Sequence, residues 1–71
     1  MDRQTLIEEA KQGAIRVFMN DGTWHDIPSL EGCLVDQIAA RVLYRDDAGT
    51  WRTKVLSLAC MSRIEHLVAE A

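Results

Sequence analysis

The sequence predicts a mainly β fold, in which one N-terminal helix precedes a small barrel of five strands. Apolar and polar residues alternate with a period of two from Ile15 to Val55, as is typical of half-buried strands. Two turn signals, Asp21-Gly22 and Asp46-Asp47-Ala48-Gly49, interrupt that alternation. We therefore expect a single domain over residues 1–71, with a helix at 2–12 and the barrel at 14–68.

The first residues have the pattern of a short amphipathic helix. Thr5 followed by Glu8 fits a capping box, and Asp2 is an earlier N-cap candidate. Gly13 suits the end of the helix, where a left-handed backbone is favourable. The helix is too short to persist alone, so we expect it to dock over one opening of the barrel. Its apolar stripe consists of Leu6, Ile7 and Ala10.

Five strands are expected after the helix, with Pro28 ending the second and residues 33–35 forming a short apolar run between turns. We expect Thr53 and Val55 to point inward, beside outward Arg52 and Lys54. The expected strands are 15–20, 24–27, 38–45, 51–58 and 63–68, and the third has Ile38, Ala40, Val42 and Tyr44 on one face.

The C-terminal segment also fits a second interpretation. Residues 56–70 are rich in Leu, Ala, Met and Glu, which favour helix, so an α+β fold with a C-terminal helix at about 56–70 is the alternative. We favour strands because the hairpin around Gly49 needs a return strand of matching length.

Composition limits the classes of function. Eleven acidic and eight basic residues give a net charge of −3, which disfavours a broad nucleic-acid or anionic-membrane footprint. No stretch resembles a membrane span, and no apolar leader follows Met1, so we expect a cytoplasmic protein. Cys33 and Cys60 lie in apolar contexts, and we expect two buried free thiols rather than a disulfide.

Residue spacing gives no support for catalysis, a cofactor or a metal. The residues of zinc-binding type are His25, Cys33, Cys60 and His66, and they form no closely spaced pair. No glycine-rich phosphate loop is present. We therefore expect a protein that is not an enzyme and carries neither cofactor nor metal.

Two sets of residues are candidates for a binding surface. Trp24 and Trp51 each follow a turn and could stack on bases or hold a peptide, although we favour a role in covering the open ends of the core. The other set would form a basic strip if its two pairs shared one side of a hairpin, although an ordinary solvated face is favoured. This second set is Arg41, Arg45, Arg52 and Lys54.

Four segments resemble a group of small bacterial proteins of Sm-like or SH3-like barrel pattern. They are Ile15-Arg16-Val17-Phe18-Met19-Asn20-Asp21-Gly22, Ile27-Pro28, Arg41-Val42-Leu43-Tyr44 and Ser62-Arg63-Ile64-Glu65. The order is more distantly similar to the Sm-like fold, including its Hfq branch, whose rings bind RNA. Asp36, Gln37 and Ile38 resemble that family's RNA-contacting segment, so the resemblance implies an RNA role for them. The family's signature before the last strand is replaced here by Ala59-Cys60-Met61-Ser62.

The leading functional hypothesis is a self-assembling module that binds a protein or a small ligand. Edge strands, either 56–58 or 63–67, are expected to pair between copies, because pairing satisfies their backbone groups and hides apolar side chains. The alternative is an Sm-like RNA-binding ring that uses Asp36, Gln37, Ile38 and the basic set.

Overall fold

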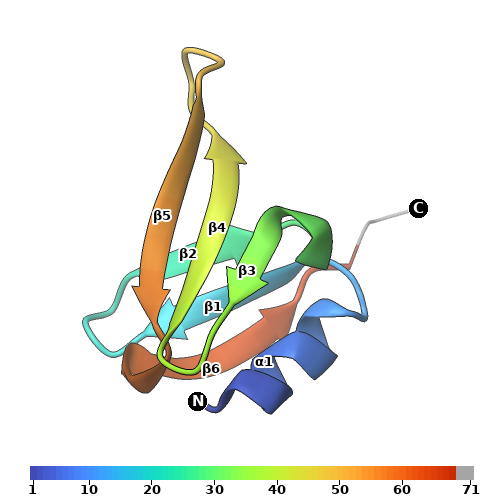
Figure 1. Ribbon diagram of the computed structural model, residues 1–71, viewed down its shortest axis with the longest axis vertical. Coiled ribbons are helices and arrows are strands. Elements are labelled where there is room, and N and C mark those ends of the chain that lie inside the picture. Colours follow the sequence, from blue (N-terminus) through green and yellow to red (C-terminus); the bar gives the residue numbers. More distant parts are fainter. Residues whose placement is uncertain (69–71) are drawn as a thin grey trace.

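The computed structural model describes residues 1–68, which form a short helix and two small antiparallel sheets that pack across each other (Figure 1). One sheet has the strand order β2-β1-β6 and the other the order β3-β4-β5. In chain order the elements are α1 (Arg3–Ala10), β1 (Ile15–Met19), β2 (Trp24–Ile27), the 3-10 turn η1 (Leu30–Gly32), β3 (Cys33–Val35), β4 (Ala39–Arg45), β5 (Trp51–Ser57), the 3-10 turn η2 (Leu58–Cys60) and β6 (Met61–His66).

The prediction of a five-stranded barrel, Sm-like or SH3-like, is wrong. The structure has six strands in two separate three-stranded sheets, and no closed barrel forms within residues 1–68. Pro28 follows β2 and has no backbone N–H with which to continue its ladder. Turn η1 then redirects the chain, so that Cys33–Val35 pair with β4 in the other sheet. The apolar run at 33–35 is therefore a strand in its own right, and β2 and β5 are both edge strands.

The alternative of a C-terminal helix at about 56–70 is also wrong for the described residues. Strand β5 continues to Ser57, η2 makes a tight turn, and β6 pairs antiparallel with β1. The backbone N–H of Asn20 donates to the Cys60 carbonyl at 2.7 Å, and the Ser62 hydroxyl donates to the Phe18 carbonyl at 3.0 Å. These cross-strand contacts override the helix propensity of the segment. The last part of the predicted helix, residues 69 and 70, lies outside the described residues.

The N-terminal helix is confirmed, with the earlier of its two predicted starts. The Asp2 carboxylate accepts a hydrogen bond from the Thr5 backbone N–H at 2.7 Å, so Asp2 is the N-cap. Gly13 has a φ of +135°, a conformation that a Cβ disfavours, and it lies where the chain leaves the helix. In Figure 1, α1 lies beside β6.

Within residues 1–68, eleven buried side chains from the helix, both sheets and η2 form one core. The fully buried members with the largest side chains are Leu6, Ile15, Ile27, Val17 and Val42. The β4–β5 hairpin extends beyond this core, away from the sheet that contains β1 (Figure 1). The remaining core members are Ala10, Cys33, Ala40, Leu56, Leu58 and Met61.

The register between β4 and β5 decides which residues face the core. Ala40 lies opposite Leu56, and Val42 opposite Lys54, so these four share the inner face of the sheet. The expectation that Thr53 and Val55 point inward is therefore wrong, because both lie on the outer face and are exposed. Ile38, expected as the first residue of this strand, instead precedes β4 and is 77% exposed.

Candidate binding surfaces

The four candidate basic residues do not form one strip. Arg41 lies opposite Val55 and Arg45 opposite Trp51, on the outer face of the β3-β4-β5 sheet. Lys54 and Arg52 lie on the inner side, opposite Val42 and Tyr44. Arg52 forms an ion pair with Asp46 in the hairpin loop. The condition for a basic strip, that both pairs share a side, is therefore not met.

The outer face of the same sheet is instead rich in exposed apolar side chains. Leu34 is 74% exposed, Val55 55%, Trp51 60% and Leu43 45%. Arg41 lies between Leu34 and Val55 across the strands, and Leu43, two residues further along β4 on the same face, is the diagonal neighbour of Leu34, Val55 and Trp51. We call this surface the outer face, and it comprises Leu34, Arg41, Leu43, Arg45, Trp51, Thr53 and Val55.

Two shallow hollows adjoin Leu43 on this face. One, of about 270 Å³, includes Leu34, Arg41 and Thr53, and the other, of about 310 Å³, includes Pro28 and Trp51. Both are lined by Leu43, Glu31 and Gly32. A Cβ at Gly32 would come 3.9 Å from the Leu43 Cβ, so the absence of a side chain there leaves the flank of Leu43 open.

The two tryptophans lie on opposite sheets and outside the core. Trp24 is 50% exposed, and the Arg16 guanidinium stacks 3.9 Å from its ring centroid. The Arg45 guanidinium lies 5.4 Å from the Trp51 ring centroid. The interpretation that each tryptophan covers an open end of the core is wrong, because both rings lie on outer sheet faces beside an arginine.

The segment of Asp36, Gln37 and Ile38 is a tight turn between β3 and β4. One carboxylate oxygen of Asp36 accepts hydrogen bonds from the backbone N–H groups of Ile38 and Ala39, both at 2.8 Å. The hydrogen bond from Ile38, and then that from Ala39, lowers the pKa of Asp36 below its usual value. Asp36 therefore stabilises the turn, and this structural role explains why an aspartate occupies the position without any role in ligand binding.

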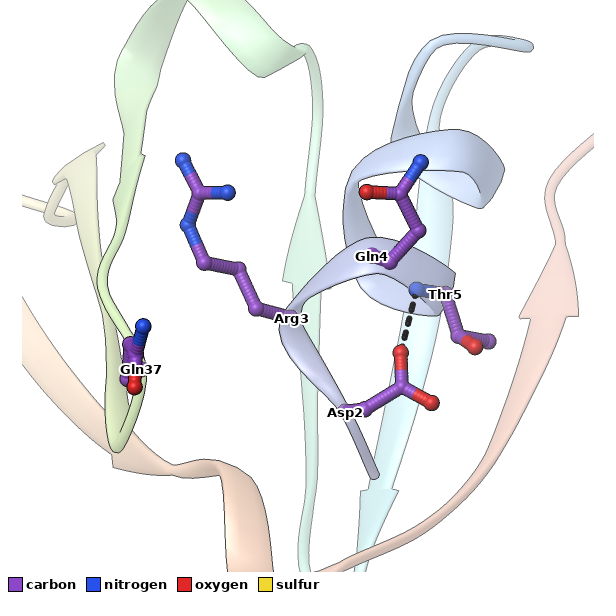
Figure 2. A pocket seen from close by; sticks show the side chains of 5 residues that line it. All are labelled: Asp2, Arg3, Gln4, Thr5 and Gln37. Carbon is purple, nitrogen blue, oxygen red and sulfur yellow. Dashed lines mark hydrogen bonds between the residues drawn. The ribbon is translucent and has the colours of Figure 1, made fainter.

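Gln37 lines a polar hollow beside the start of α1, together with Asp2, Arg3, Gln4 and Thr5 (Figure 2). The Arg3 side chain lies between Gln37 and the helix in this view, and its Nε donates to the Val35 carbonyl at 3.0 Å. The Asp2 carboxylate is directed at the Thr5 backbone N–H. The hollow thus lies at the contact between the start of the helix and the β3–β4 turn.

A fourth hollow lies where the β1–β2 hairpin meets the end of β5. It has a volume of about 450 Å³. His25 and Lys54 both line it, and each is half-buried. Burial, and then the nearby Lys54 charge, lowers the pKa of His25, and burial lowers the pKa of Lys54. The other lining residues are Met19, Asn20, Asp21, Thr23, Val55, Leu56, Ser57 and Cys60.

The two cysteines are free, but they differ in environment. Cys33 is buried, and burial raises the pKa of its thiol. Cys60 is exposed, so the expectation of two buried thiols is wrong for this residue. Over residues 1–68, no three His, Cys, Asp or Glu side chains are grouped so as to hold a metal ion.

The residues that sequence reasoning missed are Leu34 and Leu43 on the outer face and His25 in the hollow between the β1–β2 hairpin and β5. Leu34 and Leu43 are apolar residues at positions that alternate with the buried Cys33 and Val42. This alternation was a usable signal, because a strand with one buried face should carry polar residues on the other. His25 gave no such signal, because its surroundings depend on how the two sheets pack.

Comparison with known proteins gave no match to a family model, to a curated protein or to a solved structure. The resemblance to small Sm-like or SH3-like bacterial proteins therefore stays a prediction. In the part of the chain that the structure describes, no helix is long and apolar enough to cross a membrane.

Proposed function

We propose that this chain is a non-enzymatic module that assembles with a second copy of itself through the outer face. The observation that carries the proposal is the adjoining set of exposed apolar side chains on a three-stranded sheet: Leu34, Leu43, Val55 and Trp51. Such sets on small proteins mark interaction sites, and two sheet faces pack well at about 10 Å separation.

The shape of the outer face favours a second copy as the occupant. Leu34 is 74% exposed on the edge strand β3, and hollows lined by Gly32 open beside Leu43. In a two-fold dimer each copy offers the same surface, so the Leu34 of each copy can enter the hollow of the other. A projection and a hollow on one face are what a self-complementary contact requires.

Charge on the outer face supports the same arrangement. Arg41 and Glu31 line the same hollow, but no ion pair joins them within residues 1–68. A two-fold axis through the hollow would place the Arg41 of each copy near the Glu31 of the other. Each charge would then gain a partner of opposite sign as the hollow closes.

The size of the core gives a thermodynamic reason for assembly. Eleven buried residues form a small core among the 68 residues that the structure describes, and small domains bury a low fraction of their surface. Burial of the outer face against a second copy would remove further apolar surface from water. The two free cysteines fit a reducing compartment, in keeping with action in the cytoplasm.

Sedimentation equilibrium of the wild-type chain and two variants tests the proposal. Leu34→Glu places a charge on the outer face, and we expect it to weaken dimerisation roughly tenfold or more. Val68→Glu is the matched control, since Val68 is 85% exposed and follows β6 in the other sheet. A wild-type chain that stays monomeric at micromolar concentration, or equal dimerisation of both variants, would contradict the proposal.

A charge swap separates the outer face from the strand edges. We expect Glu31→Arg and Arg41→Glu each to weaken the dimer and the double variant to regain much of the loss. Strands β5 and β6 are edge strands, so pairing between copies along them is the competing arrangement. Assembly that is unaffected by the swap would point to those edges and away from the outer face.

A further inference from the structure

We propose that the hollow between the β1–β2 hairpin and β5 binds a small monocarboxylate with an apolar body, whose carboxylate lies between Lys54 and His25. This inference does not rest on self-assembly, because Val55 is the one residue of the outer face among those that line the hollow. It opens between edge strands of the two sheets and has a volume of about 450 Å³, enough for a short-chain acid.

The positive end of the hollow is formed by Lys54. Its Nζ lies 4.9 Å from the Tyr44 ring centroid, and no carboxylate of residues 1–68 comes within 4 Å of it. The nearest acidic group on β2, Asp26, is engaged by Arg16 through two hydrogen bonds of 2.8 and 3.2 Å. Lys54 is thus half-buried, and within residues 1–68 its ammonium has no ion-pair partner, which a carboxylate ligand would supply.

His25 lies on the opposite wall, on the same face of the β1–β2 pair as the buried Val17. Burial, and then the nearby Lys54 charge, lowers the pKa of His25 and so favours the neutral imidazole. A bound carboxylate would reverse that preference, because a negative charge between the two groups stabilises the protonated form of each. The other charged groups around His25 are Asp21 and Asp26, which already act in that direction.

The rest of the lining sets the class of acid. Met19 and Leu56 form an apolar part of the wall of the hollow, so the body of the ligand should be apolar. Asp21 stands at the hairpin end, held by hydrogen bonds from the Thr23 N–H at 2.9 Å and the Thr23 hydroxyl at 2.6 Å. Its carboxylate opposes a second negative charge in the hollow, so monocarboxylates are favoured over dicarboxylates.

Titration of the wild-type chain with hexanoate, followed by amide NMR shifts, tests the site. We expect saturable shifts along Met19–His25 and Lys54–Ser57, weaker binding of adipate and 1-hexanol, and an upward shift of the His25 pKa in the presence of hexanoate. Lys54→Met should weaken hexanoate binding at least fivefold. Lys11→Met is the matched control, because Lys11 is the only other lysine, lies on the exposed end of the helix and should bind like wild type.

Three results would overturn the proposal. Equal binding of hexanoate and 1-hexanol would mean an apolar hollow without a carboxylate site. Equal loss in the two lysine variants would mean an effect of net charge alone. Undiminished binding by a folded Lys54→Met chain would place the carboxylate elsewhere. Lys54→Arg keeps the charge and should keep most of the affinity, which separates loss of the cation from misfolding.

Discussion

Arg41 and Val55 lie directly opposite each other on β4 and β5, and both side chains are exposed on the outer face. One residue further along β4, Val42 is fully buried opposite Lys54. The two-residue period of the strand thus separates the surface that we propose for assembly from the inner surface, which forms the core and carries Lys54.

Substitutions at Gly32 and Gly49 should separate effects on dimerisation through the outer face from effects on the stability of the fold. Gly49 has a φ of +81°, so Gly49→Ala should destabilise the chain by about 1 kcal/mol. A Cβ at Gly32 would meet Leu43 only at ordinary contact distances of 3.8 and 3.9 Å, so Gly32→Ala should fold normally. It should nevertheless weaken dimerisation, because the new methyl group partly fills both hollows.

Urea denaturation measures the stability of these two variants, and sedimentation equilibrium measures their dimerisation. The expected pattern is a stability loss with little effect on assembly for Gly49→Ala, and the reverse for Gly32→Ala. A Gly32→Ala chain that is fully folded and dimerises as well as wild type would argue against a contact over Leu43.

The division of the basic residues predicts weak RNA binding. Because Arg41 and Arg45 point away from Arg52 and Lys54, the four cations cannot follow one phosphate backbone on a single face. Fluorescence anisotropy with a labelled single-stranded RNA should show little binding even at low salt. Tight, salt-dependent binding that is lost on alanine substitution in both pairs would restore the RNA-binding alternative.

Stability should fall in acid because several aspartates hold turns. Hydrogen bonds lower the pKa of Asp2, Asp21 and Asp36. The pKa of Asp46 is also lowered, and the largest cause is the hydrogen bond from the Arg52 side chain. A carboxyl whose pKa is lower in the folded than in the unfolded chain stabilises the fold above its unfolded value, near pH 4. That contribution is lost as pH falls through the folded value.

Urea midpoints measured from pH 7 down to pH 2 check this expectation. Asp36→Asn should be less stable than wild type at pH 7 and lose less on acidification, because its turn no longer depends on an ionised group. Asp47→Asn is the matched control, since no residue of 1–68 donates a hydrogen bond to the Asp47 carboxylate. Identical pH profiles for the two variants would contradict the role given to Asp36.

The two cysteines should react at very different rates. The exposed Cys60 should be modified by a thiol reagent in the native chain, whereas Cys33 is buried and its pKa is raised by burial. Mass spectrometry should therefore show one modified thiol under native conditions and two in denaturant. Rapid native labelling of Cys33 would indicate that the core near β3 opens readily.

The local parts of the fold follow from the sequence. Asp2 at the helix start, Gly13 after its end and the Asp46–Gly49 loop are all confirmed, because each depends on backbone conformation within a few residues. The partner of residues 33–35 could not be predicted in this way, since it depends on the direction that Pro28 and η1 give to the chain.

Which residues of β5 face the core could not be predicted from the sequence for a similar reason. Val55 and Leu56 are adjacent and both apolar, so alternation along Arg52–Leu56 is compatible with either residue in the core. Pairing of Leu56 with the buried Ala40 decides the matter, and this pairing is a tertiary contact. The hollow at Lys54 could therefore not be predicted from the alternation along β5 alone.

An isotope-filtered NMR experiment on a dimer of one labelled and one unlabelled copy tests the central claim most directly. Contacts between copies are predicted among the methyl groups of Leu34, Leu43 and Val55 and the ring of Trp51. Contacts between copies that are confined to the edges of β5 and β6, or none at a concentration where the chain is dimeric, would contradict assembly through the outer face.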